Sequence, residues 1–428
     1  MNVTRRQFLG AAAVVGGTAA LTGDPFSTTP PAAVAATSTA LPAPAASGID
    51  HIVVVMMENR SFDHFMGWLP GANGKQSGLT YVDRFGSSHS TYHLNQFASC
   101  GHQDPDHSYE GGRIQLNGGR VDGWLRAGED DLLPIGYYGK PDLAFLGQAA
   151  PSWTMCDQYF SAVMAETYPN RFYMHAARTD RLHNSTVTST LPTIWDRLAA
   201  ANLTGRYYYS DIPFVALWGT KYQSISRPFA TFLSDAAAGT LPQVSFIDPR
   251  FEDEASGSSS DDHPHADIRA GEQFLNEVYT AVTKSPNWSR TLLVVNFDEW
   301  GGFFDHVAPT TAPDVSPSTA LRGFRVPALV VSPRARRGFV AHNVYDHTSV
   351  LKAIEWRWGL PALTPRDSSA RNLAEVLDFS VPANLKAPSF TLPPFVATTC
   401  TPAAVSGPEQ GEWSGLRDKA TADGWSLP

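Results

Sequence analysis

The segments IVVVMMEN (52–59) and TLLVVNFDE (291–299) decide the fold predicted for this chain. Each is a run of apolar, mostly β-branched residues, which is typical of a strand buried on both faces of a parallel sheet. Each run ends in an adjacent polar pair, and the two pairs are Glu58 with Asn59 and Asp298 with Glu299. Parallel sheets place ligand sites at the carboxyl ends of their strands, so three carboxylates and one amide are expected to converge at one edge.

This set of oxygen donors predicts a divalent metal ion as the cofactor. Hard oxygen ligands bind such ions, and a bound cation offsets the repulsion among clustered carboxylates. An all-oxygen set with an amide suits calcium, magnesium or manganese, and nearby histidines leave zinc and iron open. An acidic residue after a strand also commonly caps the next helix, so either pair taken alone has a purely structural explanation. The working hypothesis is a metal-dependent hydrolase.

Composition limits the classes of protein that fit. With 428 residues, of which 43% are hydrophobic and 11% aromatic, the chain can bury the core of one large α/β domain or of two smaller ones. Its formal net charge of −9 argues against a nucleic-acid partner, which requires clustered basic residues. Nothing in the sequence points to an obligate protein partner.

The three cysteines do not form a zinc motif. Cys100, Cys156 and Cys400 show no CxxC spacing. They allow one disulfide and one free thiol, and the sequence leaves the pairing open.

The amino terminus resembles a twin-arginine export signal. Arg5 and Arg6 in TRRQFLG precede the apolar AAAVVGGTAALTG, and small residues follow around 33–36. The apolar stretch is short and glycine-rich for a transmembrane anchor. We therefore expect a signal over residues 1–36, a linker rich in Ala, Pro, Thr and Ser over 37–48, and a secreted or extracytoplasmic protein that is exported folded.

From residue 49 onward the pattern alternates strand and helix. This order predicts an α/β fold in which a central, mostly parallel sheet is covered by helices on both faces. Further strands are expected in GRYYYSD, QVSFID and VPALVVSP, and helices in ADIRAGEQFLNEVYTAVTKS and YDHTSVLKAIEWRWG. The segment 69–151, rich in Gly, Asp, Asn and His, is expected to form long loops around the site. We expect a catalytic domain over 49–380 and a proline-rich carboxy-terminal strap or tail over 381–428.

Six sequence blocks are similar to one enzyme family. They are MMENRSFDHFMGWLPG, DPDHSYE, AETYPNRFY, DDHPHADIRAGEQF, FDEWGGFFDHV and YDHTSVLKAIEWRWGL. Their order and spacing resemble the bacterial non-haemolytic phospholipase C and acid phosphatase family, which also includes plant non-specific phospholipases C. The resemblance covers about 49–378 and implies an alkaline-phosphatase-like α/β sandwich that hydrolyses phosphate esters. This chain is too short for the carboxy-terminal β domains of the larger members, so a role tied to those domains is not expected.

The resemblance implies a set of site residues. The metal ligands it implies are Glu58, Asn59, Thr167, Asp298 and Glu299. Thr167, in AETYPNRF, stands where the family keeps its nucleophile. With Pro169 two residues later it looks like a helix start, where amide donors and the helix dipole favour a phosphate. A hydroxyl is a weak nucleophile until a metal lowers its pKa. The alternative is that Thr167 is only a helix N-cap.

Histidines supply the remaining chemistry. His107 and His263 match active-site histidines of the family, and His265 would point to the same side as His263 on an extended segment. His306 either folds over the metal or, with Asp305, fixes its loop by hydrogen bonds. Near neutral pH a histidine can bind phosphate oxygens or protonate a departing alcohol.

Arg171 is the predicted substrate-binding residue. It lies on the first turn after Thr167, where it could contact phosphate, but an arginine there is as often a salt-bridging helix residue.

The function predicted from these residues is a phospholipase C that produces diacylglycerol and a phosphorylated head group through a phospho-threonine intermediate. Aromatic residues in loops could contact lipid during a transient encounter with a membrane surface, or they could simply pack in the core. The main alternative is an acid phosphatase that acts on soluble monoesters. A non-catalytic secreted binding protein is a remote alternative, since it should lack the nucleophile and the acidic pairs.

Overall fold

A computed structural model describes residues 40–401 and 411–428. The predicted export signal over 1–36 and the first residues of the linker lie outside the described residues. None of the described helices is both long enough and apolar enough to cross a membrane.

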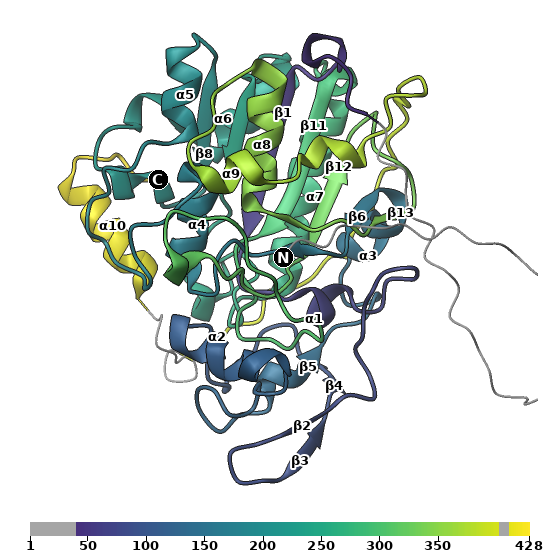
Figure 1. The fold of residues 1–428 in the computed structure, drawn as a ribbon, viewed down its shortest axis with the longest axis vertical. Helices are drawn as coiled ribbons and strands as arrows, with labels where there is room; N and C mark the ends of the chain where they lie inside the picture. Colours follow the sequence, from purple (N-terminus) through teal and green to yellow (C-terminus); the bar gives the residue numbers. More distant parts are fainter. Residues whose placement is uncertain (1–39, 402–410) are drawn as a thin grey trace, which may run out of the picture. The chain divides into compact units, whose positions relative to one another are not determined.

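The core is an eight-stranded sheet with the order β13-β6-β12-β11-β1-β10-β8-β9 (Figure 1). Its five predicted strands are present as β1 His51–Met57, β8 Gly205–Tyr209, β10 Val244–Ile247, β11 Thr291–Phe297 and β12 Ala328–Val331. The other three are β6 Thr154–Cys156, β9 Ser226–Pro228 and β13 Phe339–Ala341. β11, β1, β10, β8 and β9 run parallel, whereas β12 runs antiparallel to both β11 and β6. The expected mostly parallel sheet is confirmed.

β1 and β11 lie side by side at the centre of the sheet. They pair in parallel from His51 opposite Thr291 to Met57 opposite Phe297. Almost every residue of the two strands is buried, as the lack of polar alternation predicts for strands covered on both faces. Because both strands end at the same level, the residues that follow Met57 and Phe297 emerge next to each other.

Helices cover both faces of this sheet. In Figure 1 α8 (His347–Trp358) lies in front of the central strands and α7 (Ile268–Lys284) lies behind them. The apolar residues at helical spacing in α7 are buried, as predicted, and α7 contacts β11. The helix α8 contacts α4 (Thr167–Ala176) and α9 (Pro365–Ser369), whereas α7 contacts α6 (Phe229–Ala238).

The segment between β1 and β6 forms the loop-rich wall expected from its composition. Its elements are α1 Phe62–Met66, β2 Thr80–Val82, β3 Ser88–Ser90, β4 Tyr92–His93, α2 Tyr109–Leu116, β5 Gly136–Tyr137 and α3 Leu146–Ala149. The remaining elements are β7 Tyr159–Phe160, which pairs with β14 Tyr345–Asp346, and the helix α5 Ile194–Ala200.

The carboxy-terminal segment is attached to the domain by a disulfide, by hydrogen bonds such as those from Tyr279 to Pro388 and from Trp288 to Leu385, and by a helix. Cys400 forms a disulfide with Cys100, and Cys156 is a buried free thiol, which settles the pairing that the sequence left open. Residues 381–401 have no regular secondary structure. Beyond them the helix α10 (Glu412–Ala422) packs against the short helix Phe214–Trp218, so the predicted tail ends in a docked helix.

Candidate active site

The two polar pairs meet where β1 and β11 end. The backbone N–H groups of Asn59 and Glu299 both donate to Asp298 Oδ1, over 3.1 and 2.7 Å. Asn59 adopts the left-handed conformation with φ 60°, which turns its side chain out of the strand direction. Gly301 packs against this turn, and a Cβ at Gly301 would lie 2.0 Å from the Asn59 carbonyl oxygen. The glycine in FDEWGG therefore allows the two strand ends to touch.

Thr167 lies beside this junction. Its buried hydroxyl donates to Asn59 Oδ1 over 3.3 Å. Glu166 occupies the N-cap position of α4 and Thr167 is the first helical residue, so the N-cap alternative for Thr167 is wrong. The structure thus brings the predicted nucleophile into contact with a predicted metal ligand.

The start of α4 offers fewer free amide donors than the sequence suggested. The Tyr168 N–H donates to Asn184 Oδ1 over 2.7 Å, and Pro169 has no N–H. Most of the anion-binding capacity expected of a helix amino terminus is therefore already used or absent.

Arg171 requires a correction, because its guanidinium is engaged by the protein itself. It donates to Asp298 Oδ2 and to Asp248 Oδ1, each over 3.0 Å, and lies 3.5 Å from Glu58 Oε1. Its second terminal nitrogen also donates to the carbonyls of Met56 and Met57. These contacts favour the salt-bridging alternative for Arg171 over the predicted binding of phosphate. Arg171 holds the carboxylates together.

The carboxylates around Arg171 outnumber it. Burial raises the pKa of Glu58, of Asp298 and of neighbouring Asp261 above their usual range, although Arg171 opposes this for Glu58 and Asp298. Burial also raises the pKa of Asp248 to about 7. The single positive charge of Arg171 therefore does not balance the negative charges of these carboxylates. If all of them are ionised, a further positive charge is needed beside them.

The donor set fits a divalent cation. Glu58 Oε1, Asp248 Oδ2 and Asp261 Oδ2 are buried and have no hydrogen-bond partner within the described part of the chain. Buried oxygens without a donor are costly unless an ion or water completes them. Carboxylate, amide and hydroxyl oxygens are also the ligands that hard divalent cations take. Glu58 is the predicted ligand among these three residues, and Glu58, Asn59, Thr167, Asp298 and Glu299 stay the predicted metal ligands.

His107 faces the same cluster. Its Nδ1 lies 2.7 Å from the Pro105 carbonyl oxygen, which fixes a proton on Nδ1. Its Nε2 lies 3.4 Å from Asn59 Nδ2 and 3.8 Å from Glu299 Oε1. The structure thus places His107 Nε2 beside two of the predicted metal ligands, Asn59 and Glu299.

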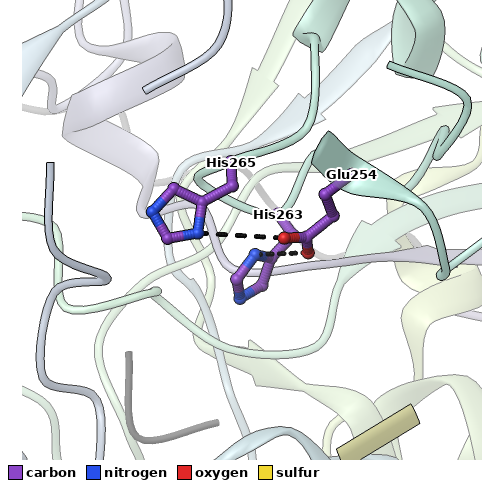
Figure 2. A group of neighbouring side chains, drawn as sticks. All are labelled: Glu254, His263 and His265. Carbon is purple, nitrogen blue, oxygen red and sulfur yellow. Dashed lines mark ion pairs between the residues drawn. The ribbon is translucent and has the colours of Figure 1, made fainter. Parts of the chain in front are cut away.

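His263 and His265 both face Glu254, as Figure 2 shows. His263 Nδ1 lies 2.7 Å from Glu254 Oε1, and His263 Nε2 lies 3.4 Å from Asp104 Oδ2. Burial by itself would lower the pKa of His263, but the charges of Glu254 and Asp104 raise this pKa well above its usual range. His265 is farther from the carboxylate, at 3.8 Å, and its Nε2 lies 3.0 Å from the His102 carbonyl oxygen. His263 is therefore held protonated, and His265 packs beside it.

These histidines belong to the same polar region as the metal ligands. The charge of His263 is among the influences that lower the pKa of Glu58. Although burial would raise the pKa of Asp104, the charges of His263, His107 and His265 bring it down to about 2. Asp104 therefore stays ionised between the two sets of groups.

His306 is placed differently. Its Nδ1 lies 2.5 Å from Asp63 Oδ2 and its Nε2 lies 3.0 Å from Asn73 Oδ1. Asp305 is held by Arg325 over 2.9 Å. The structure thus favours the loop-fixing alternative for His306, and we remove it from the catalytic set.

Three residues near the site were missed by the sequence analysis. Asp248 directly follows β10, so the strand-end rule that identified the polar pairs could have found it. Asp261 precedes His263 in a quoted block, and its carbonyl accepts the Glu58 N–H over 2.8 Å. Trp413 donates from its indole Nε1 to Glu58 Oε2 over 3.2 Å. No signal in the sequence points to this third residue.

Comparisons with known proteins show the family to which the chain belongs. A model of the Phosphoesterase family matches residues 49–361. A non-hemolytic phospholipase C of Pseudomonas aeruginosa is 31% identical over 78% of this chain, which spans 58% of that protein. Phospholipase C B of Mycobacterium tuberculosis is 29% identical, over 95% of this chain and 92% of its own length. A non-specific phospholipase C of Arabidopsis thaliana is 32% identical over 75% of this chain and 69% of its own length.

One solved structure gives a weaker likeness. A protein of the alkaline phosphatase superfamily from Vibrio parahaemolyticus aligns with 76% of this chain and 70% of its own, with a TM-score of 0.38 and 10% identity.

Proposed function

We propose that this chain, which belongs to the phosphoesterase family, is a metal-dependent phospholipase C. Membership and the phospholipase C relatives assign it to the phosphoric ester hydrolases. The finer proposal is hydrolysis of glycerophospholipids to diacylglycerol and a phosphorylated head group. The observation that carries it is the contact of the Thr167 hydroxyl with Asn59, at the junction of the two acidic strand ends.

The chain's own residues take distinct roles in this proposal. We expect a divalent cation to be held by Glu58, Asn59, Thr167, Asp298 and Glu299. When bound, it would lower the pKa of the Thr167 hydroxyl and offset charge on the phosphate. Arg171 keeps Asp298 and Glu58 together, and Asn59 aims the hydroxyl.

The reaction then runs in two steps. Thr167 loses its proton to water, and its Oγ forms a bond to phosphorus as the bond between phosphorus and the diacylglycerol oxygen breaks. His263 gives its proton to that oxygen, since Glu254 and Asp104 keep the ring protonated. Water next attacks phosphorus and passes one proton to His263, while the bond between phosphorus and Thr167 Oγ breaks. This step frees the phosphorylated head group, and Thr167 Oγ takes up a proton again from water. His107 Nε2 donates to a phosphate oxygen when its ring is protonated.

We also propose that the protein acts outside the cytoplasm. Residues 1–36 carry the twin-arginine pattern, and the Cys100–Cys400 disulfide supports an oxidising compartment, where such bonds persist. Fractionation of cells that express the chain tests this, with Arg5→Lys and Arg6→Lys together as the matched variant. Accumulation of wild-type protein in the cytoplasm would contradict the proposal.

The substrate class is tested with two chromogenic esters. A phosphorylcholine diester and a phosphate monoester are incubated with the mature protein, with and without chelator. We expect diester hydrolysis to dominate and chelator to abolish it. A dominant monoester activity would instead indicate an acid phosphatase.

Thr167→Ala tests the nucleophile. It should lower turnover by at least about a thousandfold, because it removes the hydroxyl on which the proposed covalent intermediate forms. Thr364→Ala is the matched control: Thr364 caps α9, so its loss should cost stability of about 1 kcal/mol and leave turnover unchanged. Turnover near the wild-type rate in Thr167→Ala would remove Thr167 as the nucleophile.

A further inference from the structure

The helix α10 reaches the candidate active site from outside the part of the chain that the family model matches. That match ends at residue 361, whereas Trp413 belongs to the first turn of α10. The Trp413 side chain is buried, and its indole Nε1 donates to Glu58 Oε2 over 3.2 Å. A carboxy-terminal residue therefore contacts the first of the predicted metal ligands.

The two carboxylate oxygens of Glu58 have different surroundings. Oε2 receives the indole N–H of Trp413. Oε1 is buried, has no hydrogen bond from any described residue and lies 3.5 Å from the guanidinium of Arg171. Oε2 has one of its lone pairs in this hydrogen bond, whereas Oε1 accepts none from the described residues and is the oxygen more open to a cation.

The Trp413 ring is itself held in place. It stacks on Phe251 with ring centroids 3.6 Å apart and planes 3° from parallel. The guanidinium of Arg171 lies 4.7 Å from the Phe251 ring centroid and 5.5 Å from that of Trp413. Two flat rings and one guanidinium thus leave the indole little freedom to move its N–H away from Glu58.

The start of α10 is also bonded to the start of α4, which carries the nucleophile. The Tyr168 hydroxyl donates to the Glu412 carbonyl over 2.9 Å, and Asn184 Nδ2 donates to the Glu412 carboxylate. Asn184 also accepts the Tyr168 N–H. α10 is therefore connected to both sides of the site, through Glu58 and through the residue that follows Thr167.

We propose that Trp413 is a positioning residue for the metal centre, which rests on the metal-binding function proposed above. Its N–H fixes Glu58 Oε2 and so presents Oε1 to the cation. Partners of this kind orient the ligands they touch, and their loss typically weakens metal binding about 10- to 100-fold. The carboxy-terminal helix then completes a centre whose ligands all come from the family-matched part of the chain.

Trp413→Phe tests this proposal with a matched control. Phenylalanine keeps an aromatic ring over Phe251 and removes the N–H donor together with part of the ring, a loss of volume that the control shares. The control is Trp425→Phe, because Trp425 is also buried in the carboxy-terminal segment, and its Nε1 donates to the Gly219 carbonyl over 3.1 Å. Both variants lose one indole hydrogen bond, but only Trp413→Phe loses one to a metal ligand.

The measurement is the dissociation constant of a metal ion. Metal-depleted full-length mature protein is titrated with calcium, magnesium, manganese, zinc and ferrous ions by calorimetry, and the ion that wild type binds most tightly at one per chain is used for the variants. We expect Trp413→Phe to raise the dissociation constant about 10- to 100-fold and Trp425→Phe to change it less than about twofold. Equal affinities in wild type and Trp413→Phe would overturn the proposal.

Two further measurements keep the result interpretable. Thermal unfolding in chelator should give both variants similar midpoints, since each loses one indole hydrogen bond and the same ring volume. If Trp413→Phe does not fold, replacement of Trp413 by benzothienylalanine removes the N–H without changing the ring shape, and the same weakening is expected. Failure of wild type to bind any of the five ions would contradict the proposed function itself, whereas binding that is insensitive to Trp413 would contradict only this inference.

Discussion

Two buried clusters in this protein each place an arginine among carboxylates, and they differ in how completely the carboxylates are satisfied. Arg325 binds Asp63 and Asp305, over 3.0 and 2.9 Å. Asp63 also accepts the backbone N–H groups of Lys75 and His306, and Asp305 accepts that of Val307. Around Arg171, in contrast, three carboxylate oxygens have no donor among the described residues.

The comparison separates a structural cluster from a candidate metal site. Both regions contain acidic residues in family-like blocks, and Asp63, Asp305 and His306 are close enough together to hold an ion. However, every carboxylate oxygen of Asp63 and Asp305 accepts a hydrogen bond from a described residue. The Arg171 cluster has carboxylate oxygens without a hydrogen bond from the described residues, so it is the candidate site for the proposed cation.

The sharpest test exchanges one acid in each cluster for its amide. Asp298→Asn should abolish metal binding and lower turnover by at least about a thousandfold, because it removes a ligand and a partner of Arg171. Asp305→Asn should leave the metal dissociation constant of the folded protein unchanged. Calorimetric titration and single-substrate kinetics on both variants check this. Loss of metal from Asp305→Asn would mean that the two clusters are not distinct.

Removal of the arginine from the satisfied cluster should cost stability. Arg325→Met leaves Asp63 and Asp305 buried without their partner, which should lower the free energy of unfolding by about 3 to 5 kcal/mol. Denaturant unfolding in the presence of metal measures it, with the exposed Arg120→Met as the control. A loss below about 1 kcal/mol would show that the Arg325 cluster is not structurally important.

Metal binding should become weaker as the pH falls. Burial raises the pKa of Asp248 to about 7. Between about pH 4 and pH 7 the metal-free folded chain therefore keeps a proton on Asp248 that the unfolded chain has lost. The stability of metal-free protein therefore falls as pH rises from about 4 to 7, whereas a bound cation favours the ionised cluster.

The difference in unfolding temperature between metal-loaded and chelator-treated protein should thus increase from pH 5.5 to pH 8. Other buried acids also change stability with pH, such as Glu272, whose pKa burial raises to about 8. They affect the metal-loaded and the chelator-treated protein equally, so their contributions cancel in this temperature difference. A difference that does not change with pH would contradict proton release from the cluster.

The smallest expected effect concerns the histidine acid. Glu254→Gln removes the larger of the two carboxylate influences that raise the pKa of His263. We expect the alkaline limb of the pH profile of kcat/KM to move to lower pH by about one unit, with activity at the optimum reduced about tenfold or less. Glu277→Gln, outside this cluster, is the control. An unchanged alkaline limb would indicate that another group supplies the proton.

Much of the site was predictable because its signals are local. The apolar runs before Glu58 and Asp298 define two buried strands, and parallel pairing brings strand ends to one edge whatever the intervening chain does. The strand-end position of Asp248 carries the same signal and was overlooked. The block that contains Thr167 matched the family, and the helix start was visible from Pro169.

The sequence by itself determined the α/β fold class and predicted the convergence of the acidic pairs, because hydrophobic periodicity depends on neighbouring residues. Its resemblance to a known family supplied the candidate nucleophile. Only the tertiary structure decided that Arg171 holds carboxylates, that His306 fixes a loop, that Cys100 pairs with Cys400 and that Trp413 contacts Glu58. These outcomes depend on which side chains meet across hundreds of residues. Such contacts depend on how distant segments pack and on which buried charged groups pair with each other. A local sequence pattern contains neither kind of information.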